Sequence, residues 1–258
     1  MAVRDKVEVA LRVPASCRPT VHNREKHELT ESIEEYTEGI YRLQEEMAEV
    51  STGDIAKYML VAPASVTTML KKLAELGLVA HTPYQGVRLT PKGEDLSIRL
   101  LRKHRLVERM LVDFLELPWD DVHDLACKLE HYISEDVADR IAKAMNFPTT
   151  CPHGNPVDAT YKDNSRRLSE CSVGEQLIVV KITDERTEFL SYVLEIGLIP
   201  QTRVYLKSRT PFGDVISLEV EGRDTPIAVG REVANSVFVG KNEESSSLLL
   251  PKETALAL

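Results

Sequence analysis

The spacing of hydrophobic residues divides the chain into helical and strand-forming segments. Over residues 30–48, apolar side chains recur every three or four positions, which is typical of a helix that buries one face. Ser51, with Asp54 three residues later, predicts the capped start of a second helix. Pro63 and Gly77 stand where the first residue and the C-terminal cap of a third helix are expected.

The same pattern predicts a hairpin and three more helices. Thr90 and Pro91 indicate the start of the first of these helices, which is long. A turn at residues 82–85 is expected to join the two strands of the hairpin. The strands are predicted over residues 78–81 and 86–90, and the helices over residues 91–115, 120–132 and 134–145.

The C-terminal part follows a different period. Residues 148–170 contain several prolines and predict an extended linker. Residues 171–240 favour short strands with one helix at 189–197, which indicates a small β-barrel of about seventy residues. The strands are expected near residues 176–181, 204–208, 215–220, 226–229 and 237–239. Residues 1–28 and 241–258 lack a sustained period and are expected to be a flexible extension and tail.

Composition limits the class of protein. The chain has 258 residues, enough for two or three domains, and a formal net charge of −9. No window approaches the ~18 uninterrupted apolar residues of a membrane span, so a cytoplasmic protein without a membrane partner is expected. The four cysteines are far apart and form no CxxC pair, which argues against a disulfide framework or a zinc ribbon.

Charge is distributed unevenly, and the basic part coincides with the third helix and the hairpin. Residues 51–93 carry five basic and two acidic side chains, whereas residues 120–147 carry three basic and seven acidic ones. Two helices followed by a β-hairpin are typical of a winged helix-turn-helix, whose second helix enters the major groove of DNA. A solvated amphipathic helix is the alternative. The side chains expected to contact DNA are Ala64, Ser65, Thr67, Thr68, Lys71, Lys72 and Arg88.

Candidate metal ligands lie at helical spacing on three of the predicted helices. Residues 123, 127, 130 and 131 would present imidazole, thiolate, carboxylate and imidazole on one helix face. His104 and Glu108 are four residues apart on an inward stripe, where ionisable groups are costly unless they are paired or bind a ligand. Glu35 and Glu38 are three residues apart on the first helix. These donors suit Fe(II), Mn(II), Co(II), Ni(II) or Zn(II) better than Ca(II).

Two motif runs, Arg102–Glu108 and Val122–His131, resemble the diphtheria toxin repressor and iron-dependent regulator family, which includes manganese transport regulators. The resemblance extends from about Ser32 to Val157. It implies a mainly α fold with small β parts, in which an N-terminal winged helix-turn-helix precedes a helical dimerisation domain and a C-terminal SH3-like, FeoA-type β-barrel. The corresponding ranges are 29–92, 93–147 and, after the linker, 171–240.

The resemblance also implies two ions per subunit. By position, its primary site corresponds to Glu35, Cys127, Glu130 and His131, with Glu38 matching a further ligand of the manganese sensors. Its second site corresponds to His104, Glu108 and His123. The barrel of related proteins adds two polar ligands, which here correspond to Glu185 and Glu188 before Phe189, with Glu in place of the usual Gln.

The sequence leaves the metal open between Mn(II) and Fe(II). An acid at Glu35 matches the manganese sensors, since the iron sensors usually have Met there, whereas Cys127 matches the iron sensors. Cys151 and His153 in the linker are assigned no role, and neither are Cys17 and Cys171.

We therefore expect a metal-activated, homodimeric transcriptional repressor of metal-uptake or homeostasis genes that binds a pseudo-palindromic double-stranded operator. Metal binding would tie the first helix to the dimerisation domain and so fix the spacing of the two recognition helices. Two other classes remain open. A metal-dependent hydrolase is disfavoured because no HExxH or GxSxG run is present, and no enzyme activity or organic small-molecule substrate is expected. A metal-transport accessory protein is suggested by the FeoA-like barrel.

Overall fold

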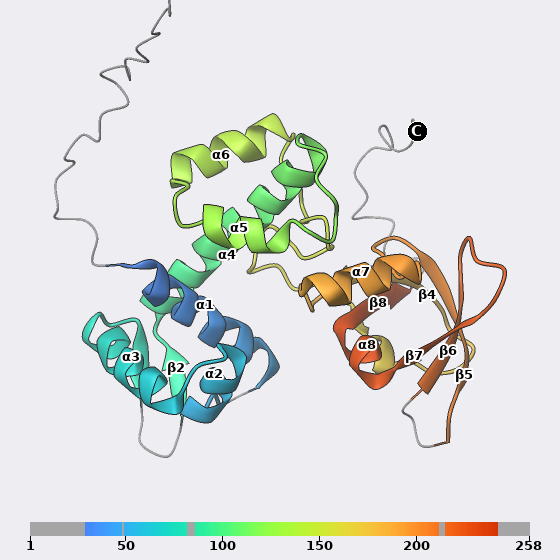
Figure 1. The fold of residues 1–258 in the computed structure, drawn as a ribbon, viewed down its shortest axis with the longest axis horizontal. Helices are drawn as coiled ribbons and strands as arrows, with labels where there is room; N and C mark the ends of the chain where they lie inside the picture. The colour runs from blue at the N-terminus through green and yellow to red at the C-terminus, as the bar shows by residue number, and fades with distance from the viewer. Residues whose placement is uncertain (1–28, 48, 82–85, 212–214, 242–258) are drawn as a thin grey trace, which may run out of the picture.

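A computed structural model describes residues 29–47, 49–81, 86–211 and 215–241. The expected N-terminal extension with Cys17, the turn at residues 82–85 and the tail beyond residue 241 lie outside the described residues. Figure 1 shows three groups of elements: α1 to α3 with a hairpin, α4 to α6 above them, and a sheet with its helices to the side. No described helix is both long enough and apolar enough to cross a membrane.

The first group is a helical domain with a two-stranded wing. The local signals in the sequence act as expected: Ser51 and Asp54 form a reciprocal capping box, Pro63 opens α3, and Gly77 has a φ of +70° directly after α3. One hydrophobic core joins the three helices to the wing, and Ile33, Ile40 and Leu73 are fully buried in it. The elements are α1 Glu31–Glu46, α2 Thr52–Tyr58, α3 Pro63–Glu75, β1 Val79–His81 and β2 Val87–Leu89.

The second group is built on the long helix α4 (Pro91–Asp113), which packs on α1 at its start and on α5 and α6 further along. Thr90 caps α4 by accepting a hydrogen bond from the Gly93 amide. A side chain at Gly93 would lie 2.2 Å from the Leu78 carbonyl oxygen, so the wing and α4 meet backbone to backbone there. The shorter helices are α5 His123–Leu129 and α6 Glu135–Ala144. The first of them starts three residues later than the expected residue 120, because residues 118–121 form a hydrogen-bonded turn.

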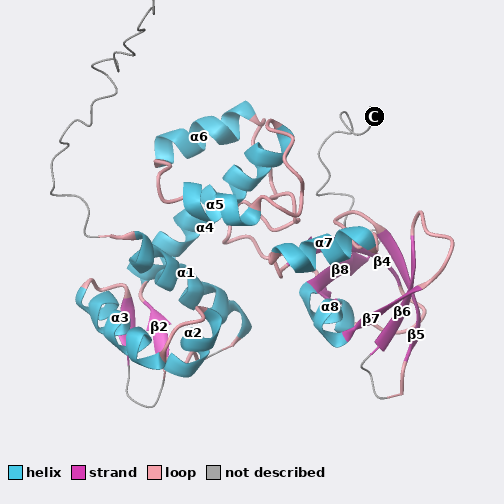
Figure 2. Cartoon of the chain, in the orientation of Figure 1, coloured by secondary structure: helices cyan, strands magenta, loops and turns pink. Residues whose placement is uncertain are grey.

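The third group is a six-stranded antiparallel sheet with order β3-β8-β4-β5-β6-β7. Figure 2 shows its strands in magenta, with α7 and α8 beside them. Alternate residues of β4, such as Leu177 and Val179, enter its core together with Leu190 of α7. The pattern of hydrophobic residues missed three short elements, β3, the 3-10 helix and α8, since each has too few residues to show a period. The elements are β3 Arg166–Arg167, the 3-10 helix Leu168–Glu170, β4 Gln176–Ile182, α7 Thr187–Glu195, β5 Arg203–Arg209, β6 Val215–Val220, β7 Ile227–Gly230, α8 Arg231–Ser236 and β8 Val237–Lys241.

The segment between α6 and β3 differs from the extended connector expected from its prolines. Residues 151–155 form a tight turn, in which the Cys151 amide donates to the Asn155 carbonyl over 2.8 Å. The Ile182 amide of β4 donates to the His153 carbonyl over 2.9 Å. Gly154 has a φ of +88°, and a side chain there would lie 2.1 Å from the Val180 carbonyl oxygen. The turn is therefore held closely against the sheet.

Candidate metal centre and DNA-reading surface

Four of the expected ligands come together at the junction of the three groups. His104, Glu108, His123 and Glu185 each offer one donor atom, and these atoms lie within 4.8 Å of one another. We call these four residues the inner set. Helix α4 supplies the first two, α5 supplies His123, and Glu185 stands just before α7. His104 Nε2 lies 3.0 Å from Glu108 Oε1, and His123 Nδ1 lies 3.4 Å from the same oxygen.

The inner set fits a divalent cation. Glu108 is 0 % exposed and His104 is 1 % exposed, yet the Oε2 atom of Glu108 has no hydrogen-bond partner among the described residues. Leaving a buried acceptor without a partner costs about 1–3 kcal/mol, and more for a charged group. A cation bound by the four side chains would offset the charge of this buried carboxylate, and two imidazoles with two carboxylates are donors that Mn(II) and Fe(II) accept.

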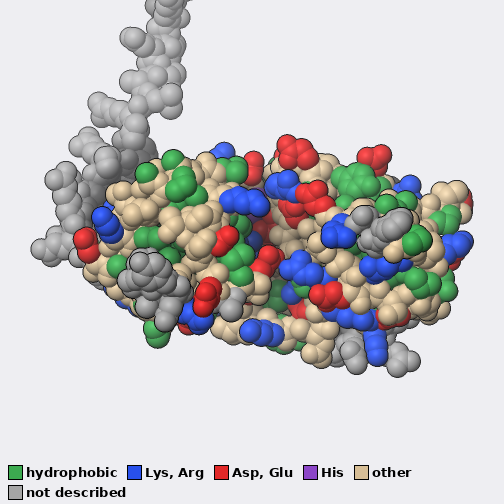
Figure 3. Space-filling model, turned by 90° about the horizontal axis from the view of Figure 1, so that it is seen from below, with side chains coloured by type: hydrophobic (Ala, Val, Ile, Leu, Met, Phe, Trp, Pro, Cys, Tyr) green, Lys and Arg blue, Asp and Glu red, His purple; other side chains and the backbone are tan. Residues whose placement is uncertain are grey.

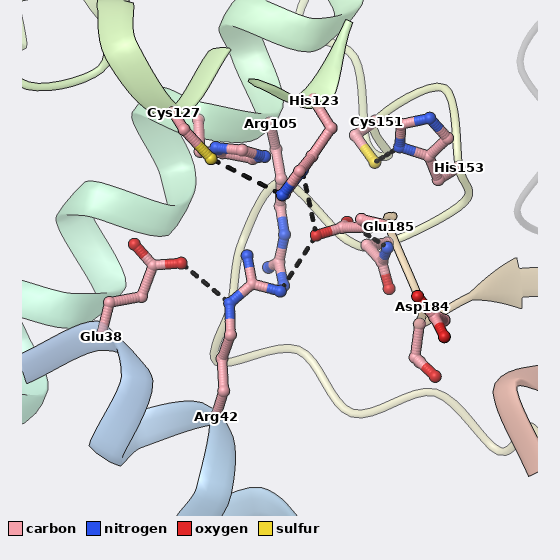
Figure 4. A network of polar contacts seen from close by, with 12 residues as sticks. Glu38, Arg42, Arg105, His123, Cys127, Cys151, His153, Asp184 and Glu185 are labelled. Atoms are coloured by element: carbon pink, nitrogen blue, oxygen red, sulfur yellow. Dashed lines mark hydrogen bonds and ion pairs between the residues drawn. The ribbon is translucent and has the colours of Figure 1, made fainter. Parts of the chain in front are cut away.

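A second donor group shares both carboxylates of the inner set. Cys151 and His153 lie within 4.8 Å of Glu108 and Glu185, measured between donor atoms. His153 Nδ1 lies 3.3 Å from Glu108 Oε1, and Figure 4 shows both side chains beside Glu185. Neither residue was expected to be a ligand. Both side chains come close to the two carboxylates because residues 151–155 form a tight turn. The Cys-Pro-His-Gly-Asn sequence of this segment favours such a turn and could have predicted it.

The four residues expected to form the primary site, Glu35, Cys127, Glu130 and His131, are called the outer set. They do not form one group in the described chain. The side chain of Glu35 is exposed and makes no hydrogen bond or ion pair with the side chains of the other described residues. Cys127 instead groups with His104 and His123, its sulfur lying 3.5 Å from His123 Nε2.

The remaining two residues of the outer set link it to α1 and to the inner set. His131 Nδ1 lies 2.7 Å from an oxygen of Glu34, a residue of α1 that sequence reasoning did not select. His131 Nε2 lies 3.7 Å from Glu130, whose other oxygen is 2.6 Å from His104 Nδ1. A continuous polar network therefore runs from α1, through the two residues that follow α5, to α4.

Two other expected ligands have different surroundings. Glu38 on α1 accepts a hydrogen bond from Arg42 Nε at 2.8 Å, and Arg42 Nη1 donates to Glu185 over 3.0 Å. Burial opposes the charge of Arg42, but the two carboxylates outweigh it and raise the pKa of the guanidinium well above its ordinary value. Glu188, in the first turn of α7, is exposed and belongs to none of the donor groups found among the described residues.

The histidines of this network bind protons strongly in the metal-free chain. Burial lowers the pKa of His123, but hydrogen bonds with Cys127 and Glu108 outweigh it and raise this pKa to about 10. The pKa of His153 is raised to about 11, since hydrogen bonds with Cys151 and Glu108 outweigh burial. Burial acts against the charge of Glu108 too, yet His104 and the hydrogen bonds with the histidines hold its pKa well below the ordinary value.

The side chains selected for DNA contact lie on the exposed face of α3 and on the wing. Ala64, Ser65, Lys71 and Lys72 are all exposed. The hydroxyls of Thr67 and Thr68 donate to carbonyls one turn earlier in α3, and Arg88 of β2 is exposed as well. The opposite face of α3 carries the buried Val66, Leu70 and Leu73, so the helix presents its polar face outward.

Comparison with known proteins agrees with this architecture. The family model of the iron dependent repressor N-terminal DNA binding domain matches residues 28–87, and that of its metal binding and dimerisation domain matches residues 90–158. A FeoA domain model matches residues 166–241. The fold and these matches define a class: a winged-helix DNA-binding protein joined to a metal-binding, dimerising helical domain.

Individual relatives narrow the class to a family. The iron-dependent repressor IdeR of Mycobacterium tuberculosis is 32% identical over 231 residues, which cover 83% of this chain and 99% of IdeR. A solved manganese-dependent transcriptional repressor in complex with manganese has a TM-score of 0.75 and 32% identity, covering 81% of this chain and 99% of its own. The structure of ScaR with bound Zn2+ has a TM-score of 0.71 and 28% identity, covering 81% and 99%.

The chain belongs to the iron-dependent repressor family of metal-dependent transcriptional repressors. The resemblance found from the two motif runs is thereby confirmed, as is the expected fold class with its winged helix-turn-helix, helical domain and FeoA-type domain.

Proposed function

We propose that this chain is a homodimeric repressor, activated by Mn(II) or Fe(II), that acts in the cytoplasm on genes of metal uptake or homeostasis. The inner set carries the proposal, because two imidazoles and two carboxylates from three parts of the chain come together there, and one oxygen of the buried Glu108 carboxylate has no partner among the described residues. The names of relatives, an iron-dependent and a manganese-dependent repressor, support the same pair of metals.

We infer two ions per subunit, one held by His104, Glu108, His123 and Glu185, and one by the outer set together with Glu38. When bound, an ion supplies the positive charge that neutralises these carboxylates and orders their side chains. The chain's own residues transmit the effect. Glu34 of α1 contacts His131, two residues after α5, at 2.7 Å, so α1 of the DNA-binding domain lies against the metal cluster. Metal raises DNA affinity to the extent that it binds more tightly when the DNA-binding domain is positioned to bind DNA.

A homodimer is supported by apolar side chains exposed on the helical domain. Phe114, Leu115 and Leu125 are 57 %, 59 % and 39 % exposed, and a second copy would cover them. Two recognition helices related by a two-fold axis would then read half-sites about one helical turn apart in a pseudo-palindromic DNA duplex.

The two alternative classes have weaker support. A metal-dependent hydrolase needs an open coordination position that a substrate can reach, whereas His104 and Glu108 of the inner set are buried. A metal-transport accessory protein has no use for the exposed polar and basic face of α3. We therefore infer a regulator without enzyme activity or an organic substrate.

The proposal is tested by DNA binding with and without metal. Fluorescence anisotropy with a duplex from upstream of the protein's own gene, at fixed salt, is expected to give at least about tenfold tighter binding with Mn(II) or anaerobic Fe(II) than with chelator, a coupling typical of metal-linked switches. Unchanged affinity with both metals would refute the proposal.

The recognition surface has its own test. The substitution Lys72→Gln on α3 is expected to weaken binding several-fold to DNA of any sequence. It should also make the slope of log affinity against log salt concentration less steep by about one, because one fewer counterion is released. Lys143→Gln, an exposed lysine on α6, is the matched control and should change neither quantity.

A further inference from the structure

Arg42 joins two expected metal ligands that come from different parts of the chain. It lies near the end of α1, yet its guanidinium reaches the segment before α7, 143 residues further along. Its Nε donates to Glu38 over 2.8 Å and its Nη1 donates to Glu185 over 3.0 Å. Figure 4 shows the guanidinium between the two carboxylates, and the side chain is only 22 % exposed.

The oxygen that Arg42 binds is the one that faces the inner set. Glu185 Oε2 accepts from Arg42 and lies 3.5 Å from His123 Nδ1. The other oxygen of Glu185 accepts from the Asn155 amide over 3.0 Å. Asn155 also donates to the Ile182 carbonyl at 2.9 Å, so the orientation of Glu185 is set from the barrel side without Arg42.

A cation held by the inner set and the guanidinium of Arg42 would share one carboxylate oxygen. Two positive charges a few ångströms apart in a largely buried site repel each other, and screening by solvent is weak there. The guanidinium also neutralises Glu38, a ligand expected for the other ion. Arg42 thus provides, without metal, part of the positive charge that metal would provide. The hollow between the DNA-binding domain and the barrel is bordered by both acidic and basic side chains (Figure 3).

We propose that Arg42 is a built-in competitor of the metal, which holds Glu38 and Glu185 in the metal-free chain and sets the metal concentration at which the ions displace it. This inference rests on the proposed function, and it adds the residue that sets the metal concentration at which the repressor is activated. Because Arg42 belongs to α1, the exchange also changes how the DNA-binding domain is attached to the barrel. A residue that merely positioned Glu185 would have the opposite effect on affinity, since its removal would weaken metal binding.

The test is the direction of the change in affinity when the charge is removed from the full-length chain. Mn(II) binding is measured by calorimetry and by electron paramagnetic resonance of free Mn(II), at one pH and salt concentration. Arg42→Met is expected to bind Mn(II) at least about tenfold more tightly than the wild type, and Arg42→Lys to remain within about threefold of it. The midpoint of the Mn(II) dependence of DNA binding should move to lower concentration by a similar factor.

Three further variants keep the result interpretable. Arg42→Gln removes the charge but keeps a donor, and it replaces the methionine variant if that one does not fold by circular dichroism. In a Glu185→Gln background the effect of Arg42→Met should shrink to less than about threefold. Arg140→Met, which removes an arginine from an exposed pair with Asp136 on α6, is the matched control.

The outcomes separate this inference from the function on which it rests. Unchanged or weaker Mn(II) binding by both uncharged variants would overturn the role of Arg42 while leaving a metal-activated repressor in place. A wild type that binds neither Mn(II) nor anaerobic Fe(II) would refute the proposed function, and the competitor role with it.

Discussion

The inner and outer sets lie side by side but differ in how far they are assembled before metal binds. The inner set is held by two turns of one helix, by α5 and by a barrel segment that Asn155 fixes, and its donor atoms lie within 4.8 Å of one another. The outer set depends on α1 meeting α5, and there Glu35 is exposed while His131 is paired with Glu34.

The difference indicates which part of the site can respond to metal. A group of donors fixed by packing can bind an ion with little rearrangement, whereas donors on separate domains must be brought together by it. We therefore expect the inner set to determine affinity and the outer set to couple metal binding to the position of the DNA-binding domain.

The largest effect is expected at the centre of the inner set. Glu108→Gln removes the charge of a fully buried carboxylate that three histidines contact, and it should weaken Mn(II) binding about 100-fold. Glu94→Gln, on an exposed position of the same helix, is the control. Calorimetric titration of both variants measures the effect, and equal affinities would show that the inner set binds no metal.

The turn that carries Cys151 and His153 is expected to contribute strongly to stability. Gly154→Ala places a methyl group 2.1 Å from the Val180 carbonyl oxygen at a φ of +88° and should lower the free energy of unfolding by about 2–4 kcal/mol. Gly174→Ala has a similar φ of +93° with nothing within 4 Å, so it should cost only about 1 kcal/mol. Thermal unfolding of the metal-free proteins compares them, and equal losses would mean that the close approach is unimportant.

Metal binding is expected to release protons. The pKa of about 10 for His123, a ligand of the inner set, means that its imidazole is protonated at neutral pH in the metal-free chain; His153, with a pKa of about 11, is protonated as well but is not among the proposed ligands. Since a metal binds only the neutral ring, affinity should rise with pH by about tenfold per unit for each proton displaced.

Calorimetry in buffers of different ionisation enthalpy counts the protons. The same shifts fix the sign for the metal-free chain: the stabilisation by these charged rings is present in full below pH ~6.5 and is lost as pH rises through their folded pKa values. An affinity that falls with rising pH would contradict the assignment of His123 as a ligand.

The smallest effect is expected on α1. Glu35→Gln should weaken Mn(II)-dependent DNA binding about tenfold, because the resemblance assigns Glu35 to the primary site. Glu34→Gln should change it by less than about threefold, since the pair with His131 exists without metal. Anisotropy at saturating and limiting Mn(II) distinguishes the two. The reverse order of effects would assign Glu34 as the ligand.

Much of the fold was predictable from the sequence because its signals are local. The capping box at Ser51, the proline that opens α3 and the cap of α4 at Thr90 each depend on residues within one helical turn. The inner-set residues His104 and Glu108 were identifiable for a similar reason. They are four positions apart in one helix, so they lie on the same face, and that face is buried.

Other parts of the site depend on contacts between residues far apart in the chain. The pairing of Glu34 rather than Glu35 with His131 is decided by the rotation of α1 against α5, which no local pattern encodes. Cys151 and His153 were assigned no role because a proline-rich stretch indicates a connector, and only its packing on β4 turns both side chains toward Glu108.

The sequence by itself therefore determined the longer helices, the wing, the strand-rich C-terminal part, the donor types and the family. Only the tertiary structure decided which donors meet, which carboxylate oxygen lacks a partner and that Arg42 holds Glu185. The physical reason is the range of the interactions: caps and helical periods act over a few residues, whereas a metal site is formed by side chains that approach only when separate domains pack together.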